Sequence, residues 1–491
     1  MKTYFKATRA SLGGTWTVMV LVASASVACD SGSSSGPEPT ERTLTVLYTN
    51  DEHGWLEEGS GTDGPAKLMG LWRNAEGYRE SGDFLILSGG DNWTGPAIST
   101  WFQGESTVDV MNVMGYSATA IGNHEFDFTV DGLRARASQA TFPFLAANIR
   151  LKGTNTSPDF ATPYVIRNVN GIRVGLVGLA SQSTPWTTFP TFVEDYDFIS
   201  YQAALEEYVP QAWNAGADVM MVLGHICYDE MTALLPTVRN LDVSVLTGGH
   251  CNETVGTVQD GVALVVGGWQ FAHYGKVTIG IEDETGEITR LQSSVRPNSG
   301  GSPDPGVQAV VATWQDAAAQ ELSEVVGYLE NSVPNGSPAL YNLITDSWLY
   351  ADPTADIAMT NSGGIRQGLP EGDITKGTVV GVLPFLNTLV RLELTGSEVI
   401  DCLRSSIVVA GMSTVAGYLH SDGTPLKADS VYNVLTTDYL YSLGSYNFSL
   451  YDETAYNTGI TYYQPTVTYL GALATSAADP LDRYLDHVPR R

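Results

Sequence analysis

Short apolar runs, each about the length of a buried strand, recur through the first half of the chain and end in polar clusters. Amphipathic segments of helical length, such as residues 201–215, separate several of these runs. This alternation predicts a layered α/β domain with parallel or mixed sheets. The runs occupy residues 44–48, 84–87, 118–121, 142–149, 174–179, 219–223 and 243–246.

Five of these runs end in side chains that can bind a metal ion. Because the carboxyl ends of parallel strands meet at one edge of a sheet, we expect these side chains to lie close together. Carboxylate, imidazole and amide groups suit hard or borderline divalent cations. A single polar residue of this kind is usually part of a turn, but five such clusters favour a metal site. The candidates are Asp51, His53, Asp91, Asn123, His124, His225, His250 and Asn252.

The second half of the chain begins after a loop-like stretch rich in Pro, Ser and Gly, at residues 289–306. Helical periodicity and good helix formers follow it, so we predict a linker helix over 305–330. No internal repeat is evident.

The chain has 491 residues, of which 43% are hydrophobic, and this is enough for more than one core. The formal net charge of -29 disfavours nucleic-acid polymers as partners, because an acidic surface repels them. A small phosphorylated substrate fits only where cations reverse the potential locally. We expect a monomer.

The first 28 residues have the pattern of a secretory signal peptide. A basic start with Lys2, Lys6 and Arg9 precedes an apolar stretch at 16–22 and a small-residue stretch at 23–28. Cys29 then resembles the lipidated cysteine of a bacterial lipobox, which predicts a lipid-anchored periplasmic or cell-surface protein.

Ser26 departs from the usual leucine of a lipobox, so cleavage without lipidation remains the alternative. Residues 29–42 read as a flexible tether.

Three further cysteines do not make a disulfide framework. Cys227 and Cys251 each lie near a candidate histidine and could approach each other. Buried small side chains are the favoured interpretation, with a disulfide as the alternative. Cys402 lies far from both in the sequence.

Five blocks, in this order, resemble the calcineurin-like metallophosphoesterases, and most closely the 5′-nucleotidase/UDP-sugar hydrolase family. The blocks are Asp51-Glu-His53-Gly54, Gly90-Asp91, Gly122-Asn-His-Glu-Phe-Asp127, Gly224-His225 and Gly248-Gly-His250. The resemblance implies a four-layer α/β metallophosphoesterase sandwich over residues 43–300.

The same resemblance implies two divalent ions, of Zn, Mn, Co or Fe, bridged by Asp91. His124 and Asp127 match the catalytic dyad of the family. Asn252 stands where the family usually has His or Gln, which predicts a weaker first site. The implied ligands are Asp51, His53, Asp91 and Asn252 for the first ion, and Asp91, Asn123, His225 and His250 for the second.

A second set of blocks, beginning with Asn361-Ser-Gly-Gly-Ile-Arg366 and Leu383-Pro-Phe-Leu-Asn387, resembles the smaller α/β C-terminal domain of the family. We place that domain at 331–485. The resemblance implies that Arg366 holds a phosphate, that Asn361 hydrogen-bonds nearby, and that Phe385 stacks on a base.

The second base-stacking aromatic falls in residues 437–448, where the acidic residue usual in the family is missing. Tyr446 and Phe448 are both candidates, and the sequence does not choose between them.

The resemblance implies a metal-dependent phosphoric ester hydrolase of the 5′-nucleotidase type, acting on nucleotides outside the cytoplasm. Nucleoside 5′-monophosphates are the favoured substrates. The alternatives are UDP-sugars, 2′,3′-cyclic nucleotides or the chemistry of the related thiosulfohydrolases. A third hypothesis, motivated by Asn252, is a lipoprotein that binds nucleotides without turnover.

Overall fold

The computed structural model describes residues 41–59, 62–415, 417–421 and 423–491. Residues 41–491 form one compact unit. The predicted signal peptide, Cys29 and most of the predicted tether lie outside the described residues. None of the helices in the described ranges has the length and apolar character needed to cross a membrane.

Two six-stranded sheets form the first domain, and both are mixed, as the alternating pattern predicts. In the first, β1 lies between antiparallel β13 and parallel β2. Its order is β14 (Ile288–Pro297), β13 (His273–Glu282), β1 (Glu41–Thr49), β2 (Phe84–Ser88), β3 (Ala118–Ala120) and β4 (Phe144–Leu145).

The second sheet has a parallel centre of four strands with an antiparallel strand at each edge. Its order is β11 (Thr254–Gln259), β12 (Val262–Gly267), β10 (Val245–Thr247), β9 (Val219–Gly224), β7 (Ile172–Leu179) and β6 (Tyr164–Val169). A separate antiparallel pair joins β5 (Ile149–Leu151) to β8 (Tyr196–Phe198).

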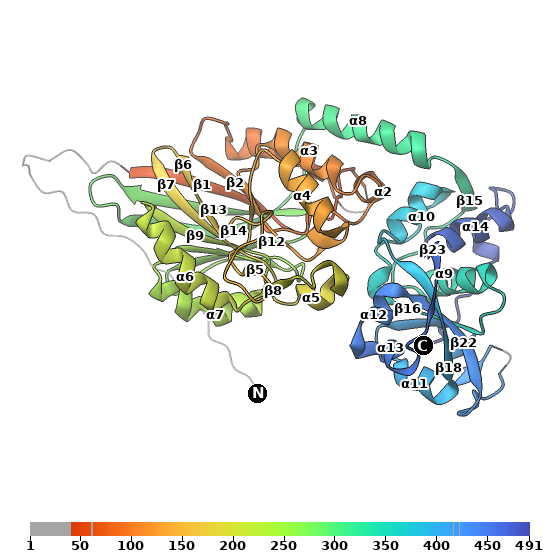
Figure 1. The fold of residues 1–491 in the computed structure, drawn as a ribbon. Coiled ribbons are helices and arrows are strands. Elements are labelled where there is room, and N and C mark those ends of the chain that lie inside the picture. Colours follow the sequence, from red (N-terminus) through yellow and green to blue (C-terminus); the bar gives the residue numbers. More distant parts are fainter. Residues whose placement is uncertain (1–40, 60–61, 416, 422) are drawn as a thin grey trace, which may run out of the picture. The chain divides into compact units, whose positions relative to one another are not determined.

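Three apolar clusters hold this domain together as four layers. One lies between the two sheets and joins residues such as Val46 and Leu176. The others pack α1, α3 and α4 against the first sheet, and α6 and α7 against the second (Figure 1). The helices are α1 (Gly64–Leu71), α2 (Ala97–Thr100), α3 (Glu105–Met114), α4 (Thr129–Gln139), α5 (Thr184–Thr187), α6 (Tyr201–Asn214) and α7 (Tyr228–Asn240).

The second domain is smaller and is built on one five-stranded sheet. Its order is β19 (Ile407–Ala410), β16 (Ile357–Asn361), β22 (Val431–Thr437), β18 (Thr388–Thr395) and β23 (Tyr456–Thr461). Two short pairs accompany it: β15 (Val325–Leu329) with β17 (Gly372–Thr375), and β20 (Met412–Ser413) with β21 (Leu419–His420). Its helices are α9 (Pro338–Ala351), α10 (Lys376–Val382), α11 (Gly396–Cys402), α12 (Asp438–Ser442), α13 (Phe448–Tyr451) and α14 (Gln464–Leu473).

The connection between the domains is shorter than the predicted helix. Helix α8 spans Pro305–Leu322, with Asp304 as its N-cap. The residues after it are not helical, because the β-branched stretch Val325–Leu329 pairs with β17 and belongs to the second domain.

The domain limits also differ from the predicted ones at both ends. Strand β1 begins at Glu41, inside the predicted tether, because Glu41 and Arg42 pair with β13. The second domain continues beyond residue 485, since Arg490 forms an ion pair with Asp346 of α9 at 2.6 Å.

Candidate active site

The candidate metal ligands lie just beyond the carboxyl ends of β1, β2, β3, β9 and β10. Several sit where the backbone turns sharply, with positive φ angles that cost a non-glycine residue about 1–3 kcal/mol each. Such strain is typical of functional sites, where the surrounding structure imposes the conformation. The candidates with positive φ are Asp51, His53, Asp91, His250 and Asn252, at 52°, 47°, 56°, 72° and 55°.

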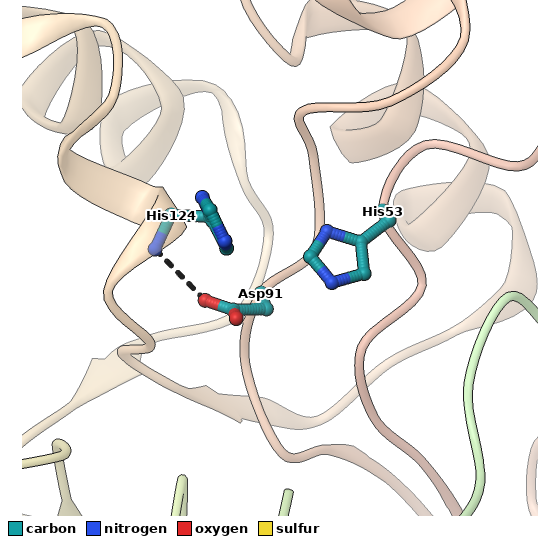
Figure 2. Close-up of side chains that lie close together, drawn as sticks. All are labelled: His53, Asp91 and His124. Carbon is teal, nitrogen blue, oxygen red and sulfur yellow. Dashed lines mark hydrogen bonds between the residues drawn. The ribbon is translucent and has the colours of Figure 1, made fainter. Parts of the chain in front are cut away.

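Two groups of these side chains are close enough to share an ion. In each group the potential ligand atoms lie within 4.8 Å of one another. Asp91 belongs to both, as expected of a bridging carboxylate. The groups are His53, Asp91 and His124 (Figure 2), and Asp91, His225 and His250.

Asp91 lies at the centre and is held on both oxygens. Its Oδ1 accepts a hydrogen bond from the backbone N–H of His124 at 2.8 Å, and its Oδ2 lies 3.1 Å from His225 Nε2. Gly122 permits this approach, because a Cβ there would lie 2.2 Å from Asp91 Oδ1. Burial opposes ionisation, but the charges of His225 and His124 outweigh it and keep the pKa of Asp91 well below its usual value.

His225 shows most directly that a cation fits this site. Its Nδ1 donates to the carbonyl of Gly89 at 2.8 Å, so in the neutral ring Nε2 is a lone pair that faces the Asp91 carboxylate. That arrangement is repulsive unless a proton or a metal ion lies between the two atoms. Burial lowers the pKa of His225, but Asp91 outweighs it and raises that pKa to about 10.

Asn123 gives a second sign that a positive ion fits this site. Its side-chain N–H₂ donates to the carbonyl of Thr187 at 3.2 Å, whereas its Oδ1 is buried and has no hydrogen-bond partner among the described residues. A buried acceptor of this kind is costly unless something binds it. The donor set therefore fits a divalent ion between Asp91, His225, His250 and Asn123.

Asp51 and His250 are linked directly. The backbone N–H of His250 donates to Asp51 Oδ2 at 3.0 Å, and Asn50 Nδ2 donates to the same oxygen at 2.6 Å. Burial raises the pKa of Asp51 to about 6, while burial and the charge of His225 lower the pKa of His250 to about 4. His250 is therefore neutral, as a metal ligand must be.

Asn252 lies on the wall of the cavity described below, beside His250. Its side chain is exposed, unlike the buried carboxylates of Asp51 and Asp91. This position is compatible with the predicted weaker first site.

His124 and Asp127, the two residues of the predicted dyad, lie side by side. His124 Nδ1 and Asp127 Oδ2 are 2.6 Å apart, and Thr188 Oγ1 donates to the other Asp127 oxygen at 3.1 Å. Burial opposes protonation of the ring, but the carboxylates of Asp127 and Asp91 outweigh it and raise the pKa of His124. The pair can hold a proton beside the metal cluster.

Glu125 holds two of the ligand-bearing loops through hydrogen bonds, a role that the sequence analysis did not predict. Its Oε2 accepts from the backbone N–H groups of Asp91 and Gly122, at 2.9 and 2.6 Å. Its Oε1 accepts from the backbone and side chain of Asn92, at 2.8 and 2.9 Å. This buried carboxylate therefore ties the loop after β2 to the loop after β3.

A cavity of about 410 Å³ joins the metal cluster to residues of the second domain. Asn361, Arg366 and Phe385, predicted to bind substrate, all line it. The Phe385 ring stacks on His124, with centroids 5.8 Å apart and planes at 25°, and the Arg366 guanidinium lies 5.8 Å from the Phe385 centroid.

Tyr446 and Phe448, the two candidates for a second base-stacking ring, do not line this cavity. Phe448 is fully buried, and its ring lies parallel to that of Tyr446, whose hydroxyl is 3.1 Å from Ser406 Oγ. Among the described residues, Tyr439 lines the cavity instead, at the carboxyl end of β22.

Two aromatic residues from the first domain also line the cavity. Phe189 and Phe192 follow α5, and their rings stack with centroids 4.9 Å apart. The ring centroids of Phe189 and Tyr439 are 6.4 Å apart. The position of Tyr439 after a strand was a signal that could have found it, but no periodicity marks the phenylalanines.

The two cysteines near the ligands form a disulfide, Cys227–Cys251, and Cys251 is exposed. The favoured interpretation, buried small thiols, is therefore wrong for this pair. Cys402 is a buried free thiol.

Comparison with known proteins supports the resemblance found in the sequence. The model of the 5′-nucleotidase C-terminal domain matches residues 323–418. The 5′-nucleotidase of Bos taurus is 28% identical over 424 residues, which cover 76% of this chain and 73% of that protein. Endonuclease YhcR of Bacillus subtilis (strain 168) is 26% identical over 457 residues, which cover 81% of this chain but only 37% of that protein.

The fold is shared with a solved structure. The 5′-nucleotidase precursor from Thermus thermophilus superposes with a TM-score of 0.75 at 23% identity, covering 91% of this chain and 99% of that one. The four-layer domain, the smaller domain after it and the His/Asp clusters agree with these matches. The chain is therefore similar to 5′-nucleotidases along most of its length and shares their two-domain fold, with residues 323–418 matching the C-terminal domain of that family after a domain whose His/Asp clusters can hold metal ions.

Proposed function

We propose that the protein hydrolyses nucleoside 5′-monophosphates to nucleoside and phosphate with the help of two divalent cations. The observation that carries this proposal is that one cavity is lined both by the His/Asp cluster and by Arg366 and Phe385. A guanidinium suits phosphate and an aromatic face suits a base, so the lining of the cavity offers a partner for each part of a nucleotide.

The residues divide into metal ligands and substrate-facing groups. Asp51, His53, Asp91 and Asn252 would hold one cation, and Asp91, Asn123, His225 and His250 the other. Ions in these positions would neutralise the negative charge that develops on the phosphoryl oxygens. Zn, Mn, Co and Fe all suit this ligand set.

His124 would protonate the leaving oxygen. Since its Nδ1 faces Asp127, its Nε2 is left for the substrate. As water adds to phosphorus and the bond to O5′ breaks, the proton on Nε2 passes to O5′. Asp127 would orient the ring and stabilise its positive charge before the transfer.

Arg366 would hold the phosphate against the cluster. In the part of the chain that the structure describes, this half-buried side chain has no ion pair with a carboxylate. Its charge is therefore available to an anionic substrate, although the protein as a whole is strongly acidic.

A second cavity favours phosphodiesters or diphosphates as the alternative substrates. It measures about 350 Å³, shares His53, Asn252 and Arg366 with the first, and is also lined by Trp55 and Trp269. A group on the far side of the reacting phosphate, as in UDP-sugars, would find room there.

We also place the protein outside the cytoplasm. The predicted signal sequence at 1–28 supports this location, and a disulfide is typical of an oxidising compartment. Attachment through a lipid on Cys29 is part of the same proposal.

The test is hydrolysis of 5′-AMP, UDP-glucose, 2′,3′-cAMP and bis-p-nitrophenyl phosphate by metal-free protein, before and after addition of Mn²⁺ or Zn²⁺. Phosphate release reports on 5′-AMP, p-nitrophenol release reports on the bis ester, and chromatography of the nucleotide products reports on the other two. We expect 5′-AMP to be cleaved only after metal addition. Preferential cleavage of UDP-glucose or the diesters would favour the alternative. Binding of 5′-AMP without turnover of any compound would overturn the proposal in favour of a binding protein.

A further inference from the structure

The Cys227–Cys251 disulfide joins the two loops that carry the ligands at the ends of β9 and β10. Cys227 lies two residues after His225, and Cys251 lies between His250 and Asn252. The cross-link spans 24 residues of sequence and brings the two Cα atoms to 5.3 Å.

The β9 end of this cross-link is anchored independently of the disulfide. The backbone N–H of His225 donates to Leu179 at 2.8 Å, and its ring donates to Gly89. Cys227 is the N-cap of α7, where its own N–H donates to Glu230 at 3.0 Å. His225 therefore keeps its position whether or not the sulfurs are bonded.

The β10 end is held at His250, whose backbone N–H donates to Asp51 and whose Nε2 lies 3.1 Å from Ser183 Oγ, but it is held less firmly at Cys251 and Asn252. His250 and Asn252, which flank Cys251, both have left-handed backbone conformations that a non-glycine residue adopts only when neighbours impose them. Cys251 and Asn252 are exposed, so little packing restrains them. Contacts that cross to the β9 loop include Gly249 N–H to the Ile226 carbonyl at 2.9 Å and Tyr228 N–H to Glu253 at 2.8 Å. The rings of His225 and His250 also meet edge-on, with centroids 5.1 Å apart.

We propose that the Cys227–Cys251 disulfide holds His250 and Asn252 in their metal-binding conformation, so that its reduction weakens metal binding. The inference rests on the proposed function, in which Asn252 is a ligand of the first cation and His250 is a ligand of the second. Cys227 and Cys251 are thus positioning residues, and they make retention of the metals depend on redox conditions.

The chemical step is ordinary thiol–disulfide exchange with a dithiol. One thiolate of the reagent attacks a sulfur of the disulfide, and its second thiol then closes the reagent into a cyclic disulfide. The protein S–S bond breaks, two electrons and two protons pass to the cysteines, and the dithiol is oxidised. The exposure of Cys251 gives the reagent access.

The experiment measures binding of Co²⁺ alone by calorimetry and by visible absorption, without substrate. Oxidised protein is compared with protein that has been reduced and then freed of dithiol under anaerobic conditions. Supports around metal ligands are typically worth about 10–100-fold in affinity, so we expect a loss of this size on reduction. Reoxidation should restore the original affinity.

The variant arm uses Cys227→Ser with Cys251→Ser, and Cys402→Ser as the matched control that removes only a buried thiol of the second domain. We expect the double variant to bind Co²⁺ as weakly as the reduced protein, and the control to bind normally. Excess metal should restore kcat to the double variant, because only occupancy is impaired. A purely structural role would instead lower the unfolding temperature of the metal-free protein without this rescue.

Equal Co²⁺ affinity in the oxidised protein, the reduced protein and the double variant would overturn the inference while leaving the proposed function intact. If the oxidised protein bound no Co²⁺ at all, the inference and the proposed metal site would both be overturned. Should the double variant fail to fold, the reduced and reoxidised wild-type protein decides alone.

Discussion

The two ends of the main cavity differ in how they are built. At the metal end, side chains come from strand ends of the first domain, and buried contacts such as those of Asp91 and Glu125 hold them. At the other end, the wall combines Phe385 and Tyr439 of the second domain with Phe189 from a loop of the first. One end therefore depends on strand ends of the two packed sheets, whereas the other depends on loops that meet only in the folded protein.

This difference predicts that substitutions at the metal end abolish turnover, whereas those at the aromatic end change mainly substrate affinity. A cluster that shares one carboxylate behaves as a unit. An aromatic wall contributes one ring at a time, so its losses are smaller and separable.

The largest effect is expected for Asp91→Asn. Loss of the carboxylate removes the proposed bridge. Loss of a general acid typically lowers kcat by about 10²–10⁴-fold, and we expect kcat on 5′-AMP to fall further than that here. Elemental analysis should show less bound metal than in wild type. Asp316→Asn, an exposed carboxylate on α8, is the matched control and should keep full activity and metal content. An Asp91→Asn variant that retained both ions would remove Asp91 from the bridging position.

His124→Ala should come next, with kcat lower by about 10²–10⁴-fold and bound metal unchanged. The reason is that this variant loses the proton donor but keeps the proposed ligands. Steady-state kinetics beside elemental analysis separates the two effects. If the variant contained less bound metal than the wild type, His124 would be a metal ligand, as its proximity to His53 and Asp91 permits.

At the aromatic end, Phe385→Ala should raise KM for 5′-AMP and leave kcat nearly unchanged. Stacking of a base on an aromatic ring is worth about 1–3 kcal/mol, which corresponds to roughly 5–150-fold. Tyr439→Ala should act in the same direction if it forms the opposite wall. A large fall in kcat for Phe385→Ala would show that the ring, which stacks on His124, also positions the dyad.

The smallest effect on activity is expected for Tyr446→Phe, which removes only the hydroxyl that contacts Ser406. Stability should fall by about 0.5–1.5 kcal/mol in denaturant unfolding, with KM for 5′-AMP unchanged. A change in KM as large as that of Phe385→Ala would place Tyr446 in the base site after all.

Much of the metal end could be read from the sequence because its information is local. Each candidate follows an apolar run, and parallel strands bring their carboxyl ends to one edge within each sheet. The ligands after β1, β2 and β3 meet those after β9 and β10 only because the two sheets pack together. The pairing of Cys227 with Cys251 was harder to predict, since it depends on how closely the loops after β9 and β10 approach.

The errors elsewhere have the same origin. Helix α8 stops at Leu322 because the next residues find a strand partner in β17, which lies far along the chain. Phe448 and Tyr439 are both aromatic residues in one stretch, but only packing decides that the first is buried and the second faces the cavity.

By itself, the sequence predicted the alternation of strands and helices in the first domain, the polar residues at strand ends and the closeness of His124 to Asp127, because periodicity and short spacing act within a few residues. Only the tertiary structure decided the buried support from Glu125, the disulfide between the ligand loops and the choice of Tyr439 for the cavity wall. These features depend on distances between segments remote in the chain, which burial and backbone pairing set once the sheets have formed.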